Sequence, residues 1–256
     1  KLKATLGGSF VSKFNTDNNT TLFNMPKNVG ATCLRMNLRY HKIRFSGEYV
    51  HKINDPYPDQ NENFNYIYKN GEGILLNLGY STKGFAIDFS AKHMDNMLWR
   101  STNVNVGPTD LLIGYLPALT KQHTYNLAAT LYPYATNFYG EIAYQLDVLY
   151  KIPKKTVLGG RYGTSIAVNF ATAHVPERKF ISDMSTSRNS YTTSIFAKSD
   201  SVLFQDFNIE IKRKINKKLK LNLNYFNFIF NDDAVKVAGY YKMIYAQIAV
   251  LDLTYK

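Results

Sequence analysis

The chain has 256 residues, of which 45% are hydrophobic, 14% aromatic and 20% charged, and its formal net charge is +12. This length suits one large all-β domain or two small ones. The positive charge indicates a negatively charged partner, such as nucleic acid or phosphate-rich lipopolysaccharide. No run approaches the roughly 18 consecutive apolar residues that a transmembrane helix needs, but a β-barrel needs no such run, because only alternate residues meet lipid. The single cysteine, Cys33, excludes an intrachain disulfide and a cysteine-based zinc site.

Apolar and polar residues alternate along the first part of the chain with the period of two that indicates a strand. Leu34 and Met36, for example, interleave with Arg35 and Asn37. Two such runs joined by a short link that contains glycine are typical of a hairpin. Strands are predicted here at 2–12, 33–40, 43–49, 74–80 and 85–92.

The second part of the chain continues the pattern, and its clearest strand is predicted at 141–152. Tyr144 and Leu146 there alternate with Gln145 and Asp147, so one face is apolar and the other polar. No helical periodicity competes with this interpretation. The other predicted strands are 109–116, 122–134, 157–172, 190–198, 202–215, 219–225 and 237–256.

Links between the predicted strands fall into two classes. Short links are expected at His41-Lys42, Ser81–Gly84, Pro153–Thr156 and Asn216–Lys218, and longer polar links at Asn15–Val29, Asn54–Gly71 and Ala173–Asn189. Transmembrane barrels have tight turns at one end and longer loops at the other. Several predicted strands also reach the roughly 9–11 residues that a tilted strand needs to cross a bilayer. The sequence therefore predicts an all-β fold, an antiparallel transmembrane β-barrel of about 12–14 strands formed by residues 1–256 as a single domain.

The alternation also assigns faces. The polar face should point into the barrel, and the aromatic residues should mostly lie outside, many at one of two levels that match the membrane interfaces. The residues predicted to face the lumen are Arg35, Arg39, Glu48, Asp88, Lys92, Gln145 and Asp147. Those predicted to face lipid include Tyr40, Tyr49, Tyr80, Phe85, Ile142, Tyr144, Leu146, Val148 and Tyr150.

Nothing in the sequence indicates an enzyme, a metal site or a cofactor. The five histidines, His41, His51, His93, His123 and His174, lack the spacing of a helical zinc site. Ser90, His93 and Asp95 lie close together, but Ser90 and His93 on one strand would point to opposite faces, which separates a nucleophile from its base. No Gly-x-Ser-x-Gly elbow is present.

A basic cluster near the C-terminal end is the strongest charge feature. It consists of Lys212, Arg213, Lys214, Lys217, Lys218 and Lys220. These residues could contact lipid phosphate or a partner protein, whereas the simpler interpretation is a hairpin turn with solvated lysines that keep strand edges soluble. Nucleic-acid binding is not predicted, because aromatic platforms would have to share a face with the basic residues, and here they alternate with them.

Several motifs are similar to those of a known family. They are Leu6-Gly7-Gly8-Ser9-Phe10-Val11-Ser12-Lys13, His51-Lys52-Ile53-Asn54-Asp55-Pro56, Asp95-Asn96-Met97, Tyr115-Leu116-Pro117-Ala118-Leu119-Thr120-Lys121-Gln122-His123-Thr124-Tyr125 and Leu131-Tyr132-Pro133-Tyr134-Ala135. With these motifs the chain resembles functionally uncharacterised outer-membrane β-barrel proteins of the Bacteroidetes. The resemblance implies a bacterial outer-membrane location and, because family members are longer at the N-terminal end, the C-terminal part of a larger barrel. It also implies a link to type IX secretion, by association alone.

Two hypotheses about function follow. The first is an integral outer-membrane barrel, in contact with lipid and lipopolysaccharide, that acts either as a pore or as a structural or accessory subunit of a cell-envelope assembly with protein partners. The second is a soluble secreted all-β binding module, whose apolar face would be a core and not a lipid surface. Extraction separates them, since a barrel needs detergent and a soluble module does not.

Overall fold

The computed structural model describes residues 1–15, 25–58, 66–101, 118–121, 123, 125, 136–183, 185, 188–231 and 243–256. Within these ranges the chain is all-β, as predicted, and its long strands pair antiparallel. The described part of the chain contains no helix long and apolar enough to cross a membrane. The long strands are β1 (Leu2–Phe14), β2 (Asn28–Tyr40), β3 (Ile43–Lys52), β6 (Gly71–Thr82), β7 (Phe85–Asp95), β8 (Gly140–Ile152), β9 (Thr164–Asp183), β10 (Arg188–Lys214), β11 (Leu219–Asn231) and β12 (Met243–Tyr255).

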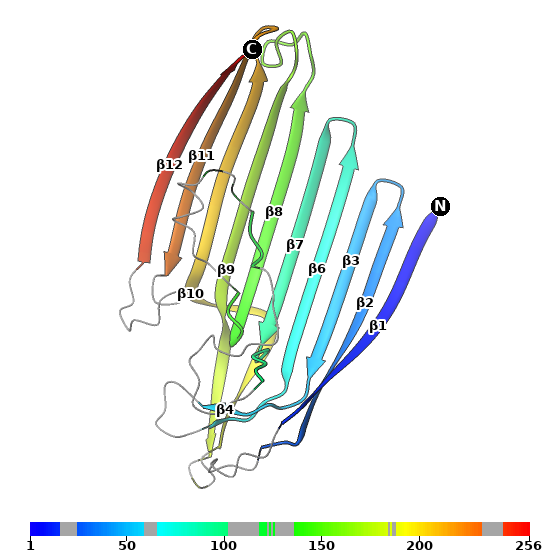
Figure 1. Ribbon diagram of the computed structural model, residues 1–256, viewed down its shortest axis with the longest axis vertical. Coiled ribbons are helices and arrows are strands. Elements are labelled where there is room, and N and C mark those ends of the chain that lie inside the picture. The colour runs from blue at the N-terminus through cyan, green and yellow to red at the C-terminus, as the bar shows by residue number, and fades with distance from the viewer. Residues whose placement is uncertain are drawn as a thin grey trace.

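These strands form one up-and-down sheet in which each strand pairs antiparallel with the next along the chain, in the order β1-β2-β3-β6-β7-β8-β9-β10-β11-β12 (Figure 1). Two short strands, β4 (Tyr57–Pro58) and β5 (Tyr66–Ile67), lie off this path. They pair with each other, and β5 also pairs in parallel with the start of β10. Long strands that follow one another along the chain are therefore always neighbours in the sheet.

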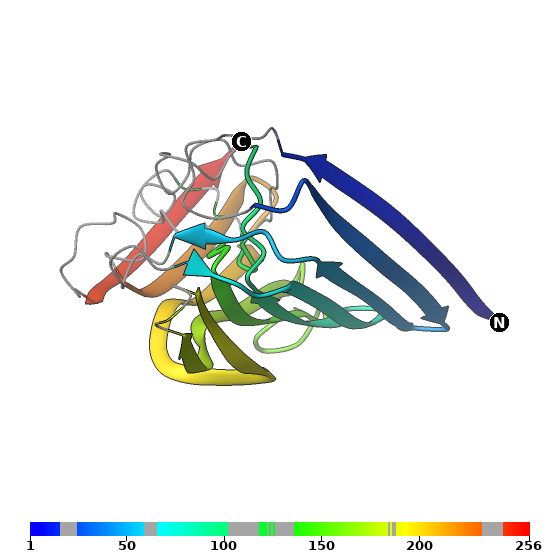
Figure 2. The ribbon, with the colours of Figure 1, turned by 90° about the horizontal axis from the view of Figure 1, so that it is seen from below.

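The sheet is strongly curved, and its first and last strands lie at two separate edges (Figure 2). Among the described strands β1 pairs only with β2, and β12 only with β11, so the predicted closure of the barrel is not present. The right-handed twist that accumulates along an antiparallel sheet explains its curvature. Because ten strands alternate in direction along the path, β1 and β12 run antiparallel to each other.

The register keeps the two faces distinct across the whole sheet. Residues directly opposite each other on paired strands share a face, since side chains alternate with a period of two. Arg35 lies opposite Glu48, and the same face continues through Leu75 and Lys92 to Ala143. From β1 to β8 this face is mostly polar and lies on the concave side of the sheet, whereas the apolar and aromatic positions lie mostly on the convex side. Over β10–β12 the concave face is partly apolar, with Phe204, Phe226, Phe228, Phe230 and Ile248.

The strand predicted at 141–152 is observed as β8. Tyr144, Leu146 and Val148 share the convex face, and Gln145 and Asp147 the concave face, because Phe89 lies opposite Leu146 and Asp88 lies opposite Asp147. The other aromatic residues predicted to point outward, Tyr40, Tyr49, Tyr80, Phe85 and Tyr150, also lie on the convex face by the same register.

Three predicted boundaries are wrong. Strand β9 begins at Thr164 and not at 157, because Lys155, Gly160 and Gly163 have positive φ and fold residues 153–163 into a compact turn. The predicted loop at 173–189 is mostly strand, since β9 continues to Asp183. The strands predicted at 190–198 and 202–215 are one strand, β10, with register irregularities between Thr193 and Phe204.

Three other strands predicted in this half of the chain lie wholly or partly outside the described residues. The strand predicted at 109–116 lies outside them, as does the start of the one predicted at 237–256, of which β12 is the described part. Of the strand predicted at 122–134 only residues 123 and 125 are described, and neither belongs to a strand.

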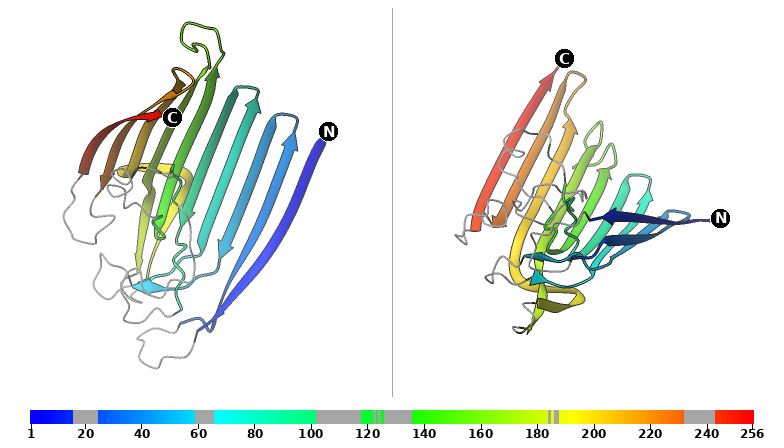
Figure 3. Two further views of the ribbon diagram at one scale, coloured as in Figure 1. Left: turned by 45° about the horizontal axis from the view of Figure 1, so that its top comes forward. Right: turned by 60° about the horizontal axis from the view of Figure 1, so that its bottom comes forward.

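The far ends of β9 and β10 extend past their neighbours and bend out of the sheet (Figure 3). The bend in β10 includes Phe196, which has a φ of 59°. Its ring contacts those of His93 and Tyr144 on the convex face. This extension gives the convex face a covered region, and Ile142, predicted to face lipid, is 0% exposed.

The two ends of the sheet differ in the length of most of their links, but the link at 153–163 is longer and the link at 184–187 shorter than predicted. At one end the strands are joined by short turns, including His41-Lys42, where His41 has a φ of 49°, and the turn ending at Gly84, where φ is 80°. The links at the other end are longer, except the four-residue link between β9 and β10 (Figure 1). These are called below the short-link end and the long-link end.

Candidate functional site on the concave face

The concave face carries a row of charged residues near the short-link end. Lys3 lies opposite Arg39, which lies opposite Arg44, so three cations occupy one row on three neighbouring strands. The row continues through Gly79 to Asp88, and Asp88 lies opposite Asp147. The register thus collects positive charge over β1–β3 and negative charge over β7 and β8.

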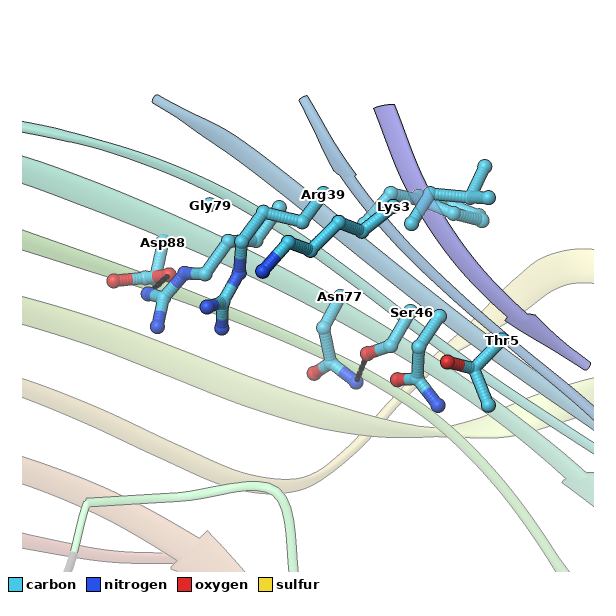
Figure 4. Close-up of a pocket in the computed structure, with 11 residues that line it drawn as sticks. Lys3, Thr5, Arg39, Ser46, Asn77, Gly79 and Asp88 are labelled. Carbon is cyan, nitrogen blue, oxygen red and sulfur yellow. Dashed lines mark hydrogen bonds and ion pairs between the residues drawn. The ribbon is translucent and has the colours of Figure 1, made fainter. Parts of the chain in front are cut away.

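A pocket of about 480 Å³ lies over the positive half of this row. Figure 4 shows its charged and polar side chains, with Lys3, Arg39 and Asp88 on the same side of the strands. The residues that line the pocket are Lys3, Thr5, Asn37, Leu38, Arg39, Arg44, Phe45, Ser46, Asn77, Gly79 and Asp88.

One ion pair crosses the pocket floor. The Arg44 guanidinium donates to Asp88 Oδ1 at 2.9 Å, and both side chains are about half exposed. The pair spans the intervening strand at Gly79, where a Cβ atom would collide with the Asp88 carboxylate. A glycine is therefore required here for close approach of the two charged groups.

A neutral polar ladder forms the next part of the floor. Asn77 Nδ2 donates to Ser46 Oγ at 3.1 Å, and Ser90 Oγ donates to Asn77 Oδ1 at 2.7 Å. Thr5 and Asn37 continue the same row toward the edge of the sheet. Hydroxyl and amide groups therefore lie directly beside the cations.

A segment that is not a strand lies against the other half of the concave face, over β10–β12. His123 Nε2 lies 2.7 Å from Asp206 Oδ2, and both side chains are almost fully buried. Lys121 donates to Asn208 Oδ1 at 2.9 Å. This stretch, defined by its described residues 118–121, 123 and 125, is called below the inner segment.

Tyr125 ties the inner segment to β11 and β12. Its hydroxyl donates to the Asp252 carboxylate and accepts from Asn222 at 2.8 Å and from Asn224 at 3.2 Å. The hydrogen bond to Asp252, together with burial, raises the pKa of Tyr125 to about 12. The phenol therefore remains a donor throughout the neutral range.

Apolar side chains support these polar contacts. The His123 ring meets Phe226 and Phe228 edge-on, with ring centroids 4.9 and 5.3 Å away. Leu119 packs against the same buried cluster. The cluster comprises Ala143, Ala173, Leu203, Phe204, Phe226, Phe228, Phe230 and Ile248. Part of the concave face is consequently a packed core and not an open surface.

Buried lysines hold loop segments over the long-link end of the concave face. Lys13 pairs with Asp55 at 2.7 Å and donates to the Arg100 carbonyl at 2.9 Å. Lys52 donates to the Leu98 carbonyl. The described loop residues around 55 and 98–100 therefore fold inward and cover this end of the face.

The whole chain, residues 1–256, matches a protein family described as a family of unknown function, DUF6029. The chain belongs to this family. No curated protein matches the chain, and no solved structure does. The family description assigns no activity.

All seven residues predicted to face a lumen lie on the concave face. Their environments differ. Lys92 is buried, with its ammonium 2.6 Å from Glu141 and a hydrogen bond to Thr136. Asp147 accepts from Gln145 and Asn169, both at 2.8 Å. The remaining predicted residues are Arg35, Arg39, Glu48 and Asp88, of which Arg39 and Asp88 line the pocket.

The six basic residues predicted as a cluster lie on the hairpin between β10 and β11 at the short-link end. They do not form one surface, since Lys212 and Lys214 share the concave face and Arg213 lies on the other. Lys212 pairs with Glu210 at 2.8 Å, and the ammonium groups of Lys214 and Lys218 lie over the rings of Tyr162 and Tyr255. The remaining two members are Lys217 and Lys220.

Ser90 and His93 point to opposite faces as predicted, with Ser90 on the concave face and His93 on the convex face. Asp95 accepts from Tyr191 and Thr193 and pairs with Lys69, so it anchors the extension of β10. Among the described residues no group of three or more His, Cys, Asp and Glu could hold a metal ion.

Sequence reasoning missed Lys3 and Arg44 as pocket residues and the acceptors Asp206, Asn208 and Asp252. Lys3 and Arg44 occupy polar positions in alternating runs, so the alternation predicts the face on which each side chain lies. Their proximity depends on the register between paired strands, which alternation along a single strand does not predict.

Proposed function

We propose that this sheet is the wall of a transmembrane β-barrel in the outer membrane of a Gram-negative bacterium. The convex face meets lipid, and the concave face lines a lumen that the inner segment partly fills. The observation that carries this proposal is the large set of exposed apolar side chains on the convex face.

Every long strand except β10 exposes at least one large apolar side chain on the convex face of the sheet proper. Leu6 is 76% exposed, Leu251 62% and Leu78 51%. Large exposed side chains of this kind on the concave strand positions are few, with Val11 and Leu149 as examples. A continuous apolar face of this extent is a liability in water and fits a lipid environment.

Tyrosines gather on the convex face near the short-link end. Tyr40, Tyr80, Tyr150 and Tyr255 each lie within a few residues of the strand terminus there and are exposed. A tyrosine suits the level at which a membrane changes from hydrocarbon to headgroup, because its ring is apolar and its hydroxyl is polar. These residues would form one of the two aromatic girdles of a barrel.

The dimensions of the strands support the proposal. Strands β1, β2, β8, β11 and β12 each have 13 residues, β6 has 12, β7 has 11 and β3 has 10. A tilted strand needs about 9–11 residues to cross a bilayer. The extra length of β9 and β10 forms the extension at the long-link end, which in such barrels is the outer side.

The soluble alternative requires a cover for the convex face. In a sandwich a second sheet packs about 10 Å away from the first. Among the described residues only the extension of β9 and β10 covers the convex face, and it covers one end. The geometry therefore supports the membrane barrel better than the soluble module.

The inner segment favours a plugged barrel or an accessory subunit over a wide passive pore. Its buried contacts with Asp206 and Asp252 occupy the concave face over β10–β12. Solutes would be confined to the half of the lumen lined by β1–β7, where the pocket lies. Envelope proteins are the partners proposed for the long-link end.

The orientation of the barrel in the membrane also determines what the basic cluster can contact. The short-link end would face the periplasm, whereas lipopolysaccharide occupies the outer leaflet. The hairpin lysines would therefore contact phospholipid phosphate of the inner leaflet or a periplasmic protein, and lipopolysaccharide would meet the opposite end of the barrel.

Fractionation tests this proposal. The protein should sediment with membranes after a carbonate wash, dissolve only with detergent, and migrate faster on a gel before boiling than after, because closed barrels resist unfolding. A monomer that remains soluble after preparation without detergent would contradict a membrane barrel.

A further inference from the structure

We propose that the pocket over β1–β3 binds a phosphorylated sugar, with the phosphate held by Lys3, Arg39 and Arg44 and the sugar hydroxyls by the neighbouring polar ladder. This inference rests on the proposed function in one respect, since the concave face must line a space that solutes reach. It adds the chemical class of the solute.

The row of cations is costly unless an anion occupies it. Like charges directly opposite each other on paired strands destabilise a sheet, and here Lys3 faces Arg39 and Arg39 faces Arg44. Among the described residues neither Lys3 nor Arg39 has an ion-pair partner, and Asp88 pairs with Arg44 alone. Three cations against one carboxylate leave the pocket positive.

Two guanidinium groups and one ammonium suit a phosphate monoester. Arginine binds phosphate oxygens through two parallel N–H groups, and lysine adds a point charge. A phosphate monoester is close to doubly charged at neutral pH. It would therefore neutralise the positive charge of the pocket that Asp88 does not neutralise.

The remainder of the pocket suits a sugar more than a bare ion. At about 480 Å³ the pocket is larger than a phosphate group requires. Beside the cations lie Thr5, Asn37, Ser46 and Asn77, whose hydroxyl and amide groups can both donate and accept. Gly79 keeps the pocket floor free of a side chain between Arg44 and Asp88, since a Cβ atom there would collide with the Asp88 carboxylate.

Calorimetric titration of the detergent-solubilised protein with glucose 6-phosphate tests the inference. Saturable binding is expected, with none for glucose and weaker binding for inorganic phosphate. Arg39→Gln should weaken binding about tenfold or more, the usual effect of losing a charge-assisted hydrogen bond. Lys3→Gln should weaken binding as well. Because Lys3 lies at the exposed start of the edge strand, this second variant leaves the sheet interior intact.

Arg35→Gln is the matched control, because Arg35 lies on the same strand and face as Arg39 but does not line the pocket. Its affinity should stay within about twofold of wild type, as removing one charge roughly 13 Å along the strand leaves the direct contacts in place. Equal losses in Arg35→Gln and Arg39→Gln would overturn the site in favour of general electrostatic attraction. Equal affinity for inorganic phosphate and glucose 6-phosphate would overturn the role of the polar ladder.

A competition arm separates the two sources of a phosphorylated sugar. If the natural ligand is a free solute, micelles containing lipid A will not displace glucose 6-phosphate. If it is the phosphorylated headgroup of lipid A, they will. Absence of binding by either ligand would overturn the inference. Binding is measured in micelles, so this result is independent of whether the protein sediments with membranes, which tests the proposed function.

Discussion

At the scale of the residue, adjacent positions on one strand have opposite tasks. On β8, Leu146 is exposed on the convex face, whereas Asp147 accepts hydrogen bonds on the concave face. The pattern of alternation is what allows one strand to serve two environments. Substitutions at neighbouring residues should therefore have very different consequences.

Leu146→Arg should block assembly, and Asp147→Asn should assemble normally. A cation on the lipid face near the midplane costs about 2–4 kcal/mol, whereas a concave substitution leaves lipid contacts unchanged. The measurement is the fraction of protein that reaches the heat-modifiable folded form in membranes. Equal tolerance of both changes, or greater damage from Asp147→Asn, would mean that β8 does not cross a membrane.

Tyr125→Phe should loosen the inner segment without unfolding the sheet. The change leaves Asp252 without its phenolic donor and removes an acceptor from Asn222 and Asn224. Loss of a buried hydrogen-bond partner costs about 1–3 kcal/mol. Hydrogen exchange of the described residues of the inner segment should accelerate, whereas Tyr150→Phe, on the exposed convex face, should leave it unchanged. Unaltered exchange in Tyr125→Phe would show that the tyrosine does not anchor the segment.

At the scale of the element, the sequence predicts the faces of strands much better than their ends. Alternation identified both faces of β8, because apolar residues lie on one face and mostly polar residues on the other. It failed at 157–163 and at 173–189, where glycine geometry and the pairing of β9 with β10 set the boundaries. Pairing between distant residues leaves no periodic signal within one strand.

The same limit applies to the candidate site. Alternation along the strands places Arg39 and Asp88 among the polar positions, but the pocket arises from the alignment of five strands. The inner segment was predicted in part as a strand, at 122–134. The described His123 and Tyr125 instead use their polar groups against β10–β12, a tertiary arrangement that outweighs local propensity.

The extension of β9 and β10 is an element with its own anchor, Asp95, which is fully buried. It accepts from Tyr191 at 2.8 Å and from Thr193 at 2.7 Å, and it pairs with Lys69 at 2.9 Å. Asp95→Asn would remove the charge that holds Lys69 and one of these acceptors. The extension should then open locally while the sheet stays folded.

Hydrogen exchange measures this opening. In Asp95→Asn, residues 188–193 should exchange faster, by an amount equivalent to about 1–3 kcal/mol, while residues 144–150 stay protected. Asp88→Asn on the same strand is the control, because its exposed ion pair is worth about 0–1 kcal/mol. If both variants behave alike, Asp95 is not the anchor of the extension.

At the scale of the whole molecule, the two edges of the sheet determine whether it closes. Strands β1 and β12 each have 13 residues and run antiparallel, so they have the lengths and directions that pairing requires. Open edges of this length, with Leu6 and Tyr245 exposed beside them, would invite aggregation. In a membrane the unpaired backbone groups would each cost several kcal/mol, and closure removes that cost.

Closure predicts uniform protection of both edge strands in the protein isolated from its membrane. In an open sheet, alternate N–H groups of β1 and β12 point away from their only neighbour and exchange rapidly, whereas a closed barrel pairs them all. Hydrogen exchange resolved to single amides distinguishes these states, with the central strand β8 as the protected reference and the mass in detergent excluding pairing between copies. Rapid exchange at every second amide of either edge strand would mean that the barrel wall remains open, and the membrane-spanning barrel would then have to be abandoned.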